Sequence, residues 1–278
     1  MRVAAFLALA MLAAAGGPAP QLVFAGGAIL TFGMLHGASD LAIAPRRSRP
    51  ALLATYGAGV IVTLLWWRVA PFTALLAFLI LSGVHFGTDD APPERMGERW
   101  CRGALMIGAP ALLHRPTLAG LFEALTGAAG ASALLAEMLA IAAVGALVLL
   151  PVLARRPSGE PDNRGELSVG IAALVLLPPL VGFAVAFTLL QARPQLMARM
   201  RALRCEGLFE YLRRTAPVLA GAAAVVAGAA LLFATGPAPA LSTVFAALAA
   251  LATPHMLSPP QWRTGELTAR PDWRAVAD

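Results

Sequence analysis

The chain contains four histidines, and two of them are each followed by an aspartate four residues later. His36 precedes Asp40, and His85 precedes Asp89. In a helix, residues four apart lie on one face, one turn from each other. Neutral imidazole binds first-row metals, and a metal-bound imidazole usually donates its other N–H to a carboxylate or carbonyl. The pairs predict metal ligands at His36 and His85, with Asp40 and Asp89 as their acceptors or as caps of the helix ends.

Other polar residues lie at the ends of apolar stretches. His255 closes the last one, and Gln191 and Gln195, again four residues apart, follow the stretch 167–190. Ionisable groups within membrane spans are expensive and are therefore usually functional. Each histidine taken alone is equally consistent with a hydrogen-bonding residue at a helix end. His114 lies in a stretch broken by proline and is interpreted as such an interfacial residue.

The composition excludes several classes of protein. Hydrophobic residues make up 59% of the 278 residues and charged residues only 13%, whereas soluble domains carry about 25% charge. Long apolar runs and a mean hydropathy of +0.74 predict a polytopic membrane protein. A soluble enzyme, a secreted disulfide scaffold and a nucleic-acid-binding domain are excluded. All 21 basic residues are arginine, and in a membrane protein they are expected in cytoplasmic loops.

The apolar stretches predict an all-α membrane bundle of about seven to nine helices with short connections. They are residues 3–15, 22–44, 52–67, 72–86, 103–127, 134–153, 167–190, 218–233 and 241–257. Residues 1–17 form a short apolar segment, either signal-like or a first helix. Residues 18–258 form one transmembrane domain, and 259–278 a polar tail. Such a chain is expected in the inner (plasma) membrane of the cell.

One topology places the polar motifs together. The basic residues after position 44 fix that end inside, and the next two spans return His85 to the same side. Residues 193–214 hold six arginines and predict an amphipathic surface helix, also inside. This arrangement requires residues 103–127, which contain Pro110 and Pro116, to be re-entrant or a partial helix. It also requires 167–190 to be a full span.

Three of these motifs resemble those of the Brp/Blh family of membrane carotene oxygenases. Residues 33–40 read GMLHGASD and resemble that family's PHGAxD signature. Residues 85–90, HFGTDD, resemble its HFGxxD motif, and residues 253–256, TPHM, resemble its late PHM motif. The order of the motifs and the chain length also agree, so that the resemblance covers nearly the whole sequence.

The resemblance implies a non-haem iron enzyme that adds O2 across the central 15,15' double bond of β-carotene and releases two retinal molecules. Carried over by motif, His36 and His85 would bind Fe(II), and Asp40 and Asp89 would be their partners. His255 would be a further pocket residue or ligand. The partners implied are a lipophilic polyene such as β-carotene, O2 and the lipid bilayer.

This sequence departs from the family pattern at several positions. The family has an HxxxH pair where residues 183–196 here read FAVAFTLLQARPQL, so that Gln191 and Gln195 replace two expected ligands. A family histidine in an HG pair falls at Arg102, and the proline of PHG is Leu35. An amide oxygen is a weaker iron ligand than imidazole, and a nearby arginine would oppose a dication.

Three hypotheses follow from this pattern. The first is an active iron-dependent carotenoid oxygenase, in which His255 or His114 substitutes for a lost ligand. The second is a catalytically impaired relative that binds a carotenoid or another polyene lipid. The third, and least favoured, is a small transporter, because the sequence has neither an internal repeat nor a continuous polar stripe.

Overall fold

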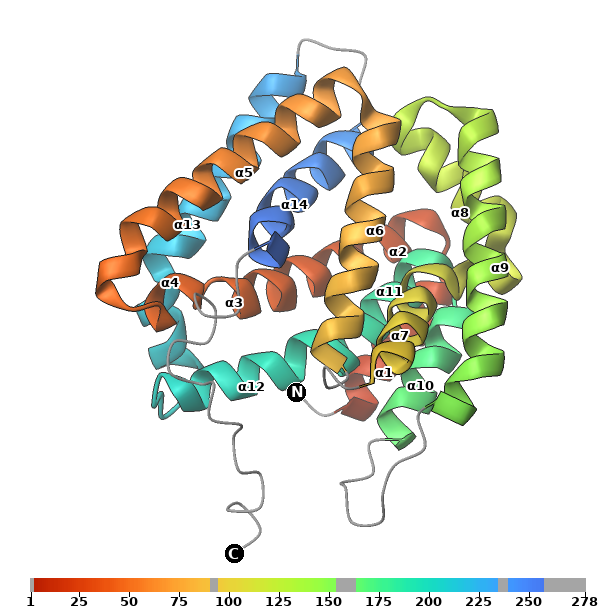
Figure 1. Ribbon diagram of the computed structural model, residues 1–278, viewed down its shortest axis with the longest axis horizontal. Coiled ribbons are helices and arrows are strands. Elements are labelled where there is room, and N and C mark those ends of the chain that lie inside the picture. Colours follow the sequence, from red (N-terminus) through yellow and green to blue (C-terminus); the bar gives the residue numbers. More distant parts are fainter. Residues whose placement is uncertain (1–2, 91–94, 154–163, 235–239, 258–278) are drawn as a thin grey trace, which may run out of the picture.

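The chain folds as a bundle of α-helices. The computed structural model describes residues 3–90, 95–153, 164–234 and 240–257, with the side chain of His36 outside the described part. No β-strand occurs in these ranges (Figure 1). Five helices are long and apolar enough to cross a membrane: Arg46–Val69, Pro71–Asp89, Ala129–Leu153, Pro179–Ala202 and Leu208–Ala234. The predicted all-α, multi-pass membrane architecture is confirmed.

The helices are more numerous than the apolar stretches because several stretches are interrupted. Up to residue 90 the elements are α1 (Val3–Ala15), α2 (Pro18–Ala28), the π-helical turn η1 (Ile29–Gly33), α3 (Met34–Gly37), α4 (Asp40–Ile43), the 3-10 turn η2 (Arg46–Ser48), α5 (Arg49–Val69) and α6 (Pro71–Asp90). Beyond residue 95 they are α7 (Met96–Gly108), α8 (Pro110–Thr126), α9 (Ala129–Leu153), α10 (Arg164–Leu176), α11 (Pro179–Ala186), the π-helical turn η3 (Phe187–Ala192), α12 (Arg193–Ala202), α13 (Leu208–Phe233) and α14 (Ala240–Leu257).

The stretch 103–127, predicted to be re-entrant or a partial helix, comprises the end of α7 and the kinked helix α8. α7 and α8 follow one another along the whole of α9, because Gly97 faces Leu153 and Gly108 faces Leu139. The interruption comes from Pro110, which begins α8, and from a non-helical conformation at His114, two residues before Pro116. Together the two helices match the length of a full span, antiparallel to α9.

Residues 167–190 do not form the single span that the sequence predicts. α10 ends at Leu176, and Pro178 begins a turn after which α11 packs back against α10. Gly182 lies against the Ala173 carbonyl, and Gly170 against Leu190, as in an antiparallel hairpin. This hairpin offsets the extra length in α7 and α8, so that Gln191 still lies at the end of the bundle where α6 ends.

The predicted surface helix 193–214 is divided between two helices. α12 continues the helix that begins at Pro179, and it ends at Ala202. Arg204 adopts a positive φ of 50°, which turns the chain before α13 begins at Leu208. α12 is not a purely exposed helix, because the Arg199 side chain is only 12% exposed.

Small residues pack the helices closely. α14 lies mainly against α5 and α13, and its buried face includes Ala246, Ala249 and Ala250. Such residues let helix backbones approach, which is how helices associate when lipid removes most of the hydrophobic driving force. α1 is packed too, since the ring of Phe6 lies 5.3 Å from that of Phe24 in α2. The predicted polar tail, 259–278, lies outside the described residues.

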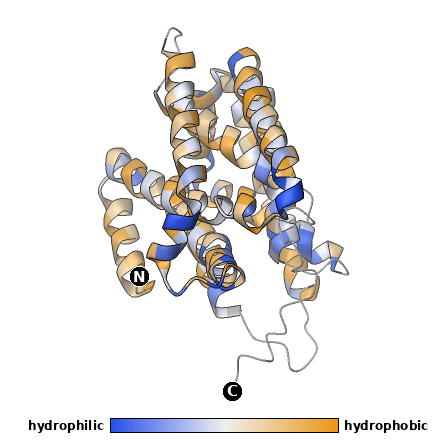
Figure 2. Cartoon of the chain, turned by 90° about the vertical axis from the view of Figure 1, so that its left-hand side faces the viewer, coloured by the Kyte–Doolittle hydropathy of each residue, from blue (hydrophilic) through white to orange (hydrophobic). Residues whose placement is uncertain are grey.

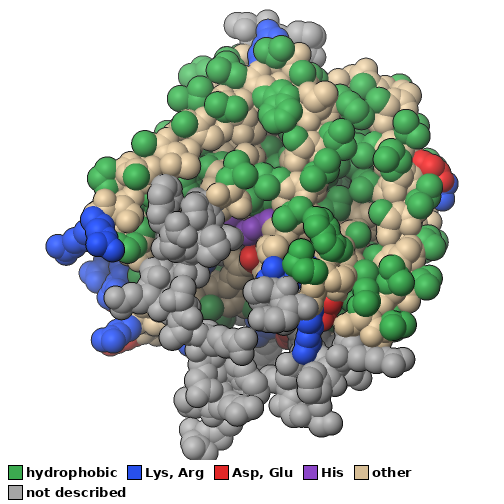
Figure 3. Space-filling model, in the orientation of Figure 1, with side chains coloured by type: hydrophobic (Ala, Val, Ile, Leu, Met, Phe, Trp, Pro, Cys, Tyr) green, Lys and Arg blue, Asp and Glu red, His purple; other side chains and the backbone are tan. Residues whose placement is uncertain are grey.

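The surface is apolar over most of the described helices. Figure 2 shows hydrophobic residues along the helices and most hydrophilic ones toward the lower half of the molecule. Figure 3 shows one face of the molecule, on which hydrophobic side chains predominate. A histidine side chain lies in a hollow near its centre, and basic side chains gather at the lower left. A surface of this kind is suited to lipid rather than water.

Candidate functional site

The end of α6 carries the first part of the site. A Cβ on Gly87 would lie 2.2 Å from the Arg99 carbonyl oxygen, and one on Gly103 would lie 2.0 Å from that of Gly83. α6 and α7 therefore touch backbone to backbone on both sides of His85, which only glycine allows at these positions. This contact fixes the position of His85 relative to α7 and the direction in which α6 presents its side chain.

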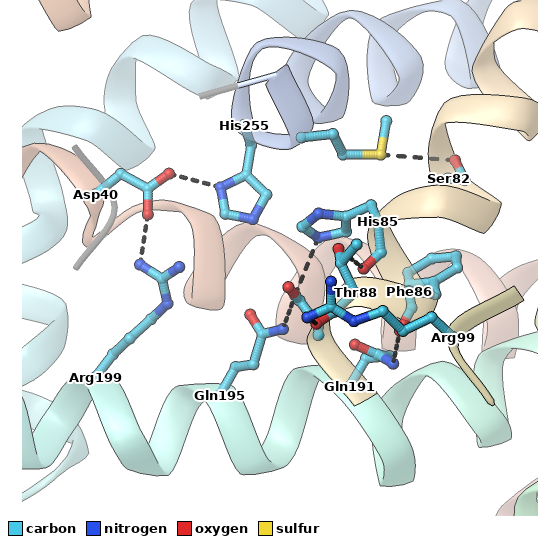
Figure 4. A network of polar contacts seen from close by, with 12 residues as sticks. Asp40, Ser82, His85, Phe86, Thr88, Arg99, Gln191, Gln195, Arg199 and His255 are labelled. Carbon is cyan, nitrogen blue, oxygen red and sulfur yellow. Dashed lines mark hydrogen bonds and ion pairs between the residues drawn. The ribbon is translucent and has the colours of Figure 1, made fainter. Parts of the chain in front are cut away.

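His85 contacts the aspartate that follows it, as the spacing predicts. The distance between His85 Nε2 and Asp89 Oδ2 is 3.3 Å. His85 is 6% exposed, and its ring lies edge-to-face with that of His255 from α14, with 5.3 Å between the centroids. The structure thus brings two of the predicted histidines together, both buried, near the end of α6 (Figure 4).

Asp40 has other partners than its sequence neighbour His36 suggests. It is 2% exposed, and its Oδ2 lies 2.6 Å from His255 Nδ1. Oδ2 also accepts a hydrogen bond from the Tyr56 hydroxyl, and Oδ1 forms an ion pair with Arg199. Asp40 therefore connects α4 with α5, α12 and α14.

The two glutamines approach the end of α6. Gln195 Nε2 donates a 2.5 Å hydrogen bond to Asp89 Oδ2, and Gln191 Nε2 makes a longer contact of 3.5 Å to the Phe86 carbonyl. Gln191 lies within the π-helical turn η3. Such turns are rare and frequently lie at functional sites. Because both nitrogens face oxygen acceptors, each amide oxygen points elsewhere, toward the space below the two histidines in Figure 4.

The other two histidines of the chain are His36 and His114. His36 lies in α3, next to the segment that Asp40 begins, and its side chain is outside the described part. His114 Nε2 lies 3.3 Å from the Leu176 carbonyl at the end of α10, so the structure does not place it in the cluster around His85. The interfacial hydrogen-bonding interpretation of His114 agrees with this contact.

The predicted effect of Arg102 is modified by its partner. Both Arg102 and Glu98 are buried on α7, and their closest nitrogen–oxygen distance is 2.6 Å. Glu98 also lies 3.6 Å from Arg95, so one carboxylate is shared between two guanidinium groups and offsets the positive charge of Arg102 only in part.

Sequence reasoning missed Arg199 and Tyr56. Arg199 continues the four-residue spacing of Gln191 and Gln195, which would have placed it on the same helix face. Tyr56 could have been noticed because the chain has only two tyrosines. The other, Tyr211, is fully buried and donates a hydrogen bond to the Leu35 carbonyl, so both tyrosines bind the segment that carries the first motif.

Apolar and aromatic side chains surround this polar cluster. Phe183 and Phe187 are stacked with ring centroids 5.9 Å apart, and Phe86 lies 6.2 Å from each of them. On the other side, a cavity of about 40 Å³ borders Asp40 and Tyr56. Its remaining lining is apolar or glycine: Gly37, Leu41, Leu52, Leu53 and Val218. A cavity of this volume has room for a molecule no larger than a few waters.

The family model for "Beta-carotene 15,15'-dioxygenase" matches residues 27–258, which include every residue of this cluster. The chain belongs to the β-carotene 15,15'-dioxygenase family. A curated relative from uncultured marine bacterium 66A03, named "Beta-carotene 15,15'-dioxygenase", is 27% identical over 254 residues, covering 82% of this chain and 89% of the relative. No solved structure matches the chain.

The donors in this family member suit iron weakly. Among the described side chains, no group of three or more His, Cys, Asp or Glu lies close enough together to hold a metal ion. The cluster instead offers the imidazoles of His85 and His255 and the amide oxygens of Gln191 and Gln195. Imidazole is a good ligand for Fe(II), and a neutral amide oxygen is a poor one. The described donors therefore comprise two good iron ligands and two poor ones.

Proposed function

We propose that this protein is a carotenoid oxygenase of the inner membrane, which takes a polyene such as β-carotene from the bilayer. The central 15,15' C=C bond of the polyene breaks, and each carbon receives one atom of O2, so that two retinal aldehydes form. The convergence of three motifs carries this proposal. Residues from positions 40, 85 and 255 meet in one buried cluster within an apolar bundle.

The residues of the cluster have distinct roles in this proposal. His36, His85 and His255 would hold Fe(II), with weak assistance from the amide oxygens of Gln191 and Gln195. When bound, the iron would supply the activation of O2. Asp89 orients His85, since metal-binding imidazoles are commonly held by a carboxylate.

The apolar surroundings would bind the polyene and exclude water. Phe86, Phe183 and Phe187 offer ring faces and edges on one side of His85. The small cavity beside Tyr56 is lined mainly by leucine, valine and glycine, so it extends the apolar surroundings without itself accommodating the polyene. β-Carotene is a hydrocarbon, so its burial against these groups is favourable without a polar partner.

One observation favours a second function, carotenoid binding without cleavage. Gln195 and Gln191 bind acceptors at the end of α6, at the positions where the family resemblance places two ligand histidines. These hydrogen bonds stabilise the cluster in the absence of iron. A member with such a site would retain the polyene and lose turnover.

Retinal measurement in β-carotene-accumulating bacteria tests the proposal. Cells expressing the chain are compared with cells expressing His36→Ala or His85→Ala, and membranes are fractionated to establish where the protein is. His114→Ala is the matched control, because it removes a histidine from the α8–α10 contact and leaves the cluster intact. We expect retinal from the unaltered chain and from the control, and none from the two cluster variants.

The opposite results are equally informative. If folded, membrane-inserted protein yields no retinal, the oxygenase proposal is rejected. Intact carotenoid that copurifies with that protein then supports the binding function. Retinal from His36→Ala and His85→Ala in the amounts given by the unaltered chain would show that the cleavage site lies elsewhere.

A further inference from the structure

Asp40 is the centre of a polar network that joins four helices. Its partners lie far away in the sequence: Tyr56 is 16 residues distant, Arg199 is 159 and His255 is 215. Arg199 also donates a 3.0 Å hydrogen bond to the neighbouring Ser39 hydroxyl. The carboxylate thus receives donors from three other elements, two of them beyond the middle of the chain.

This network does not follow from helix packing. α14 packs mainly on α5 and α13, and it has few other contacts with α4. A buried ion pair contributes little net stability, because desolvation of both charges offsets their attraction. Intramembrane charges are accordingly rare outside functional positions. A charged pair aimed at a histidine from another helix indicates a role in orienting that histidine.

The chemistry of the contact defines that role. An ionised carboxylate is only an acceptor, so His255 Nδ1, at 2.6 Å, must carry the proton. The Arg199 guanidinium favours the ionised form of Asp40. In the neutral imidazole, the form that can bind a metal, the second ring nitrogen carries a lone pair, and it points toward the space beside His85 and Gln195 (Figure 4).

We propose that Asp40, Arg199 and Tyr56 are positioning residues that fix His255 as the Nδ1–H tautomer, with Nε2 directed at the reaction site. The proposal rests on the proposed function and extends it, because it gives His255 a defined role in the site. Its core, the tautomer and its cause, does not depend on turnover. It also assigns a role to Arg199, the third residue on the face that carries Gln191 and Gln195.

The helix Pro179–Ala202 is the common support of this arrangement. Its side chains at 191, 195 and 199 reach, in order, the Phe86 carbonyl, Asp89 and Asp40. One helix face therefore holds both aspartates of the two His-x3-Asp motifs. A shift of this helix would move the orienting groups of His85 and His255 together.

Nitrogen NMR of histidine-labelled full-length protein in lipid nanodiscs tests the tautomer. The chain has only four histidines, so each ring can be assigned by substitution. We expect His255 to be almost entirely the Nδ1–H tautomer in the unaltered protein. In Asp40→Ala it should become a mixture in which the Nε2–H form predominates, as in free neutral histidine.

Further variants separate positioning from general loss of structure. Arg199→Met and Tyr56→Phe keep the carboxylate and should broaden or shift only the His255 signals, whereas Arg199→Lys should preserve them. Arg102→Met breaks a buried ion pair on α7 that does not touch His255 and should leave its tautomer unchanged. These variants keep the test decisive if Asp40→Ala does not fold.

Metal titration links the inference to the site. Loss of an orienting partner typically lowers metal affinity about 10–100-fold, and we expect this change for cobalt(II) binding to Asp40→Ala. An Nε2–H tautomer of His255 in the unaltered protein, or no change in folded Asp40→Ala, would overturn the inference. The expected tautomer in a protein that forms no retinal would instead reject only the proposed oxygenase function.

Discussion

Asp40 and Asp89 have the same spacing from a preceding histidine but opposite surroundings. Asp89 is partly exposed, contacts His85 on its own helix, and accepts a hydrogen bond from Gln195. Asp40 is buried and contacts Arg199 and His255, each more than 150 residues away in the sequence. The spacing places each carboxylate one turn after its histidine, and the fold adds the partners that are distant in the sequence.

The two aspartates also differ in what they stabilise. The contact between Asp89 and His85 lies within one helix and is 3.3 Å long, and the Asp89 side chain is 23% exposed, so the pair contributes little. The Asp40 contacts join helices, so their loss leaves Arg199 as an uncompensated buried charge. This difference predicts that substitution of Asp40 has a much larger effect than substitution of Asp89.

The largest effect is expected for Asp40→Ala. Removal of one partner of a buried pair costs about 3–5 kcal/mol of unfolding free energy, measurable by reversible denaturation in detergent. Asp40→Leu combined with Arg199→Met should recover much of this stability, because a well-packed apolar pair of similar volume replaces the ions. It should not recover the His255 tautomer. A single variant as stable as the unaltered chain would remove the distinction between the two aspartates.

Gly87→Ala should have the next largest effect, at the Asp89 end of the site. Its Cβ would lie 2.2 Å from the Arg99 carbonyl, so that α7 must move away from α6. Overpacking of this kind costs about 1–3 kcal/mol. Gly120→Ala, where nothing lies within 4 Å, is the matched control and should change the midpoint of thermal unfolding little. Equal behaviour of the two variants would contradict the backbone contact.

Replacement of both glutamines by histidine should strengthen the site. Gln191→His with Gln195→His supplies two imidazoles, and the residue at 195 could still donate one N–H to Asp89. Imidazole is the better iron ligand, so iron affinity should rise by about tenfold or more, measured by titration of purified protein. Gln21→His, on α2, controls for the addition of an imidazole. Unchanged affinity would show that neither glutamine faces the metal.

Asp89→Asn should have the smallest effect. The contact of the partly exposed Asp89 with His85 contributes about 0.2–1 kcal/mol, and the asparagine oxygen can still accept a hydrogen bond. We expect thermal stability close to that of the unaltered chain and a modest loss of retinal formation in cells. A loss as large as that of Asp40→Ala would show that solvent exposure does not separate the two motifs.

Local patterns in the sequence predicted a large part of this molecule. Hydropathy gave the all-α membrane architecture, and the four-residue spacing gave the contact of His85 with Asp89. The predicted topology also placed the motifs together at one end of the bundle, although the helices between them follow a course that it did not predict. α7 and α8 together extend along the whole of α9, and the hairpin of α10 and α11 restores the side on which Gln191 lies.

Long-range partners could not be predicted in the same way. Asp40 contacts Arg199 and His255 because α12 and α14 lie beside it. The positions of these helices are set by the turn at Pro178 and by contacts between helices. Arg199 was grouped with the arginines of an expected surface helix, since net charge alone does not show which side chain turns inward. Spacing along one helix is local information, whereas the network is a property of the tertiary fold.

The π-helical turns η1 and η3 make the site sensitive to insertions and deletions. Each residue of an α-helix turns the chain by about 100°, and a π-helical turn holds one residue more than a regular turn. Deletion of a single residue within 29–33 or 187–192 could therefore restore a regular helix without breaking it. The register beyond the deletion would change, and His36 or Gln195 would rotate to another face. Length variation among relatives at these two positions would thus alter the chemistry while the bundle persists.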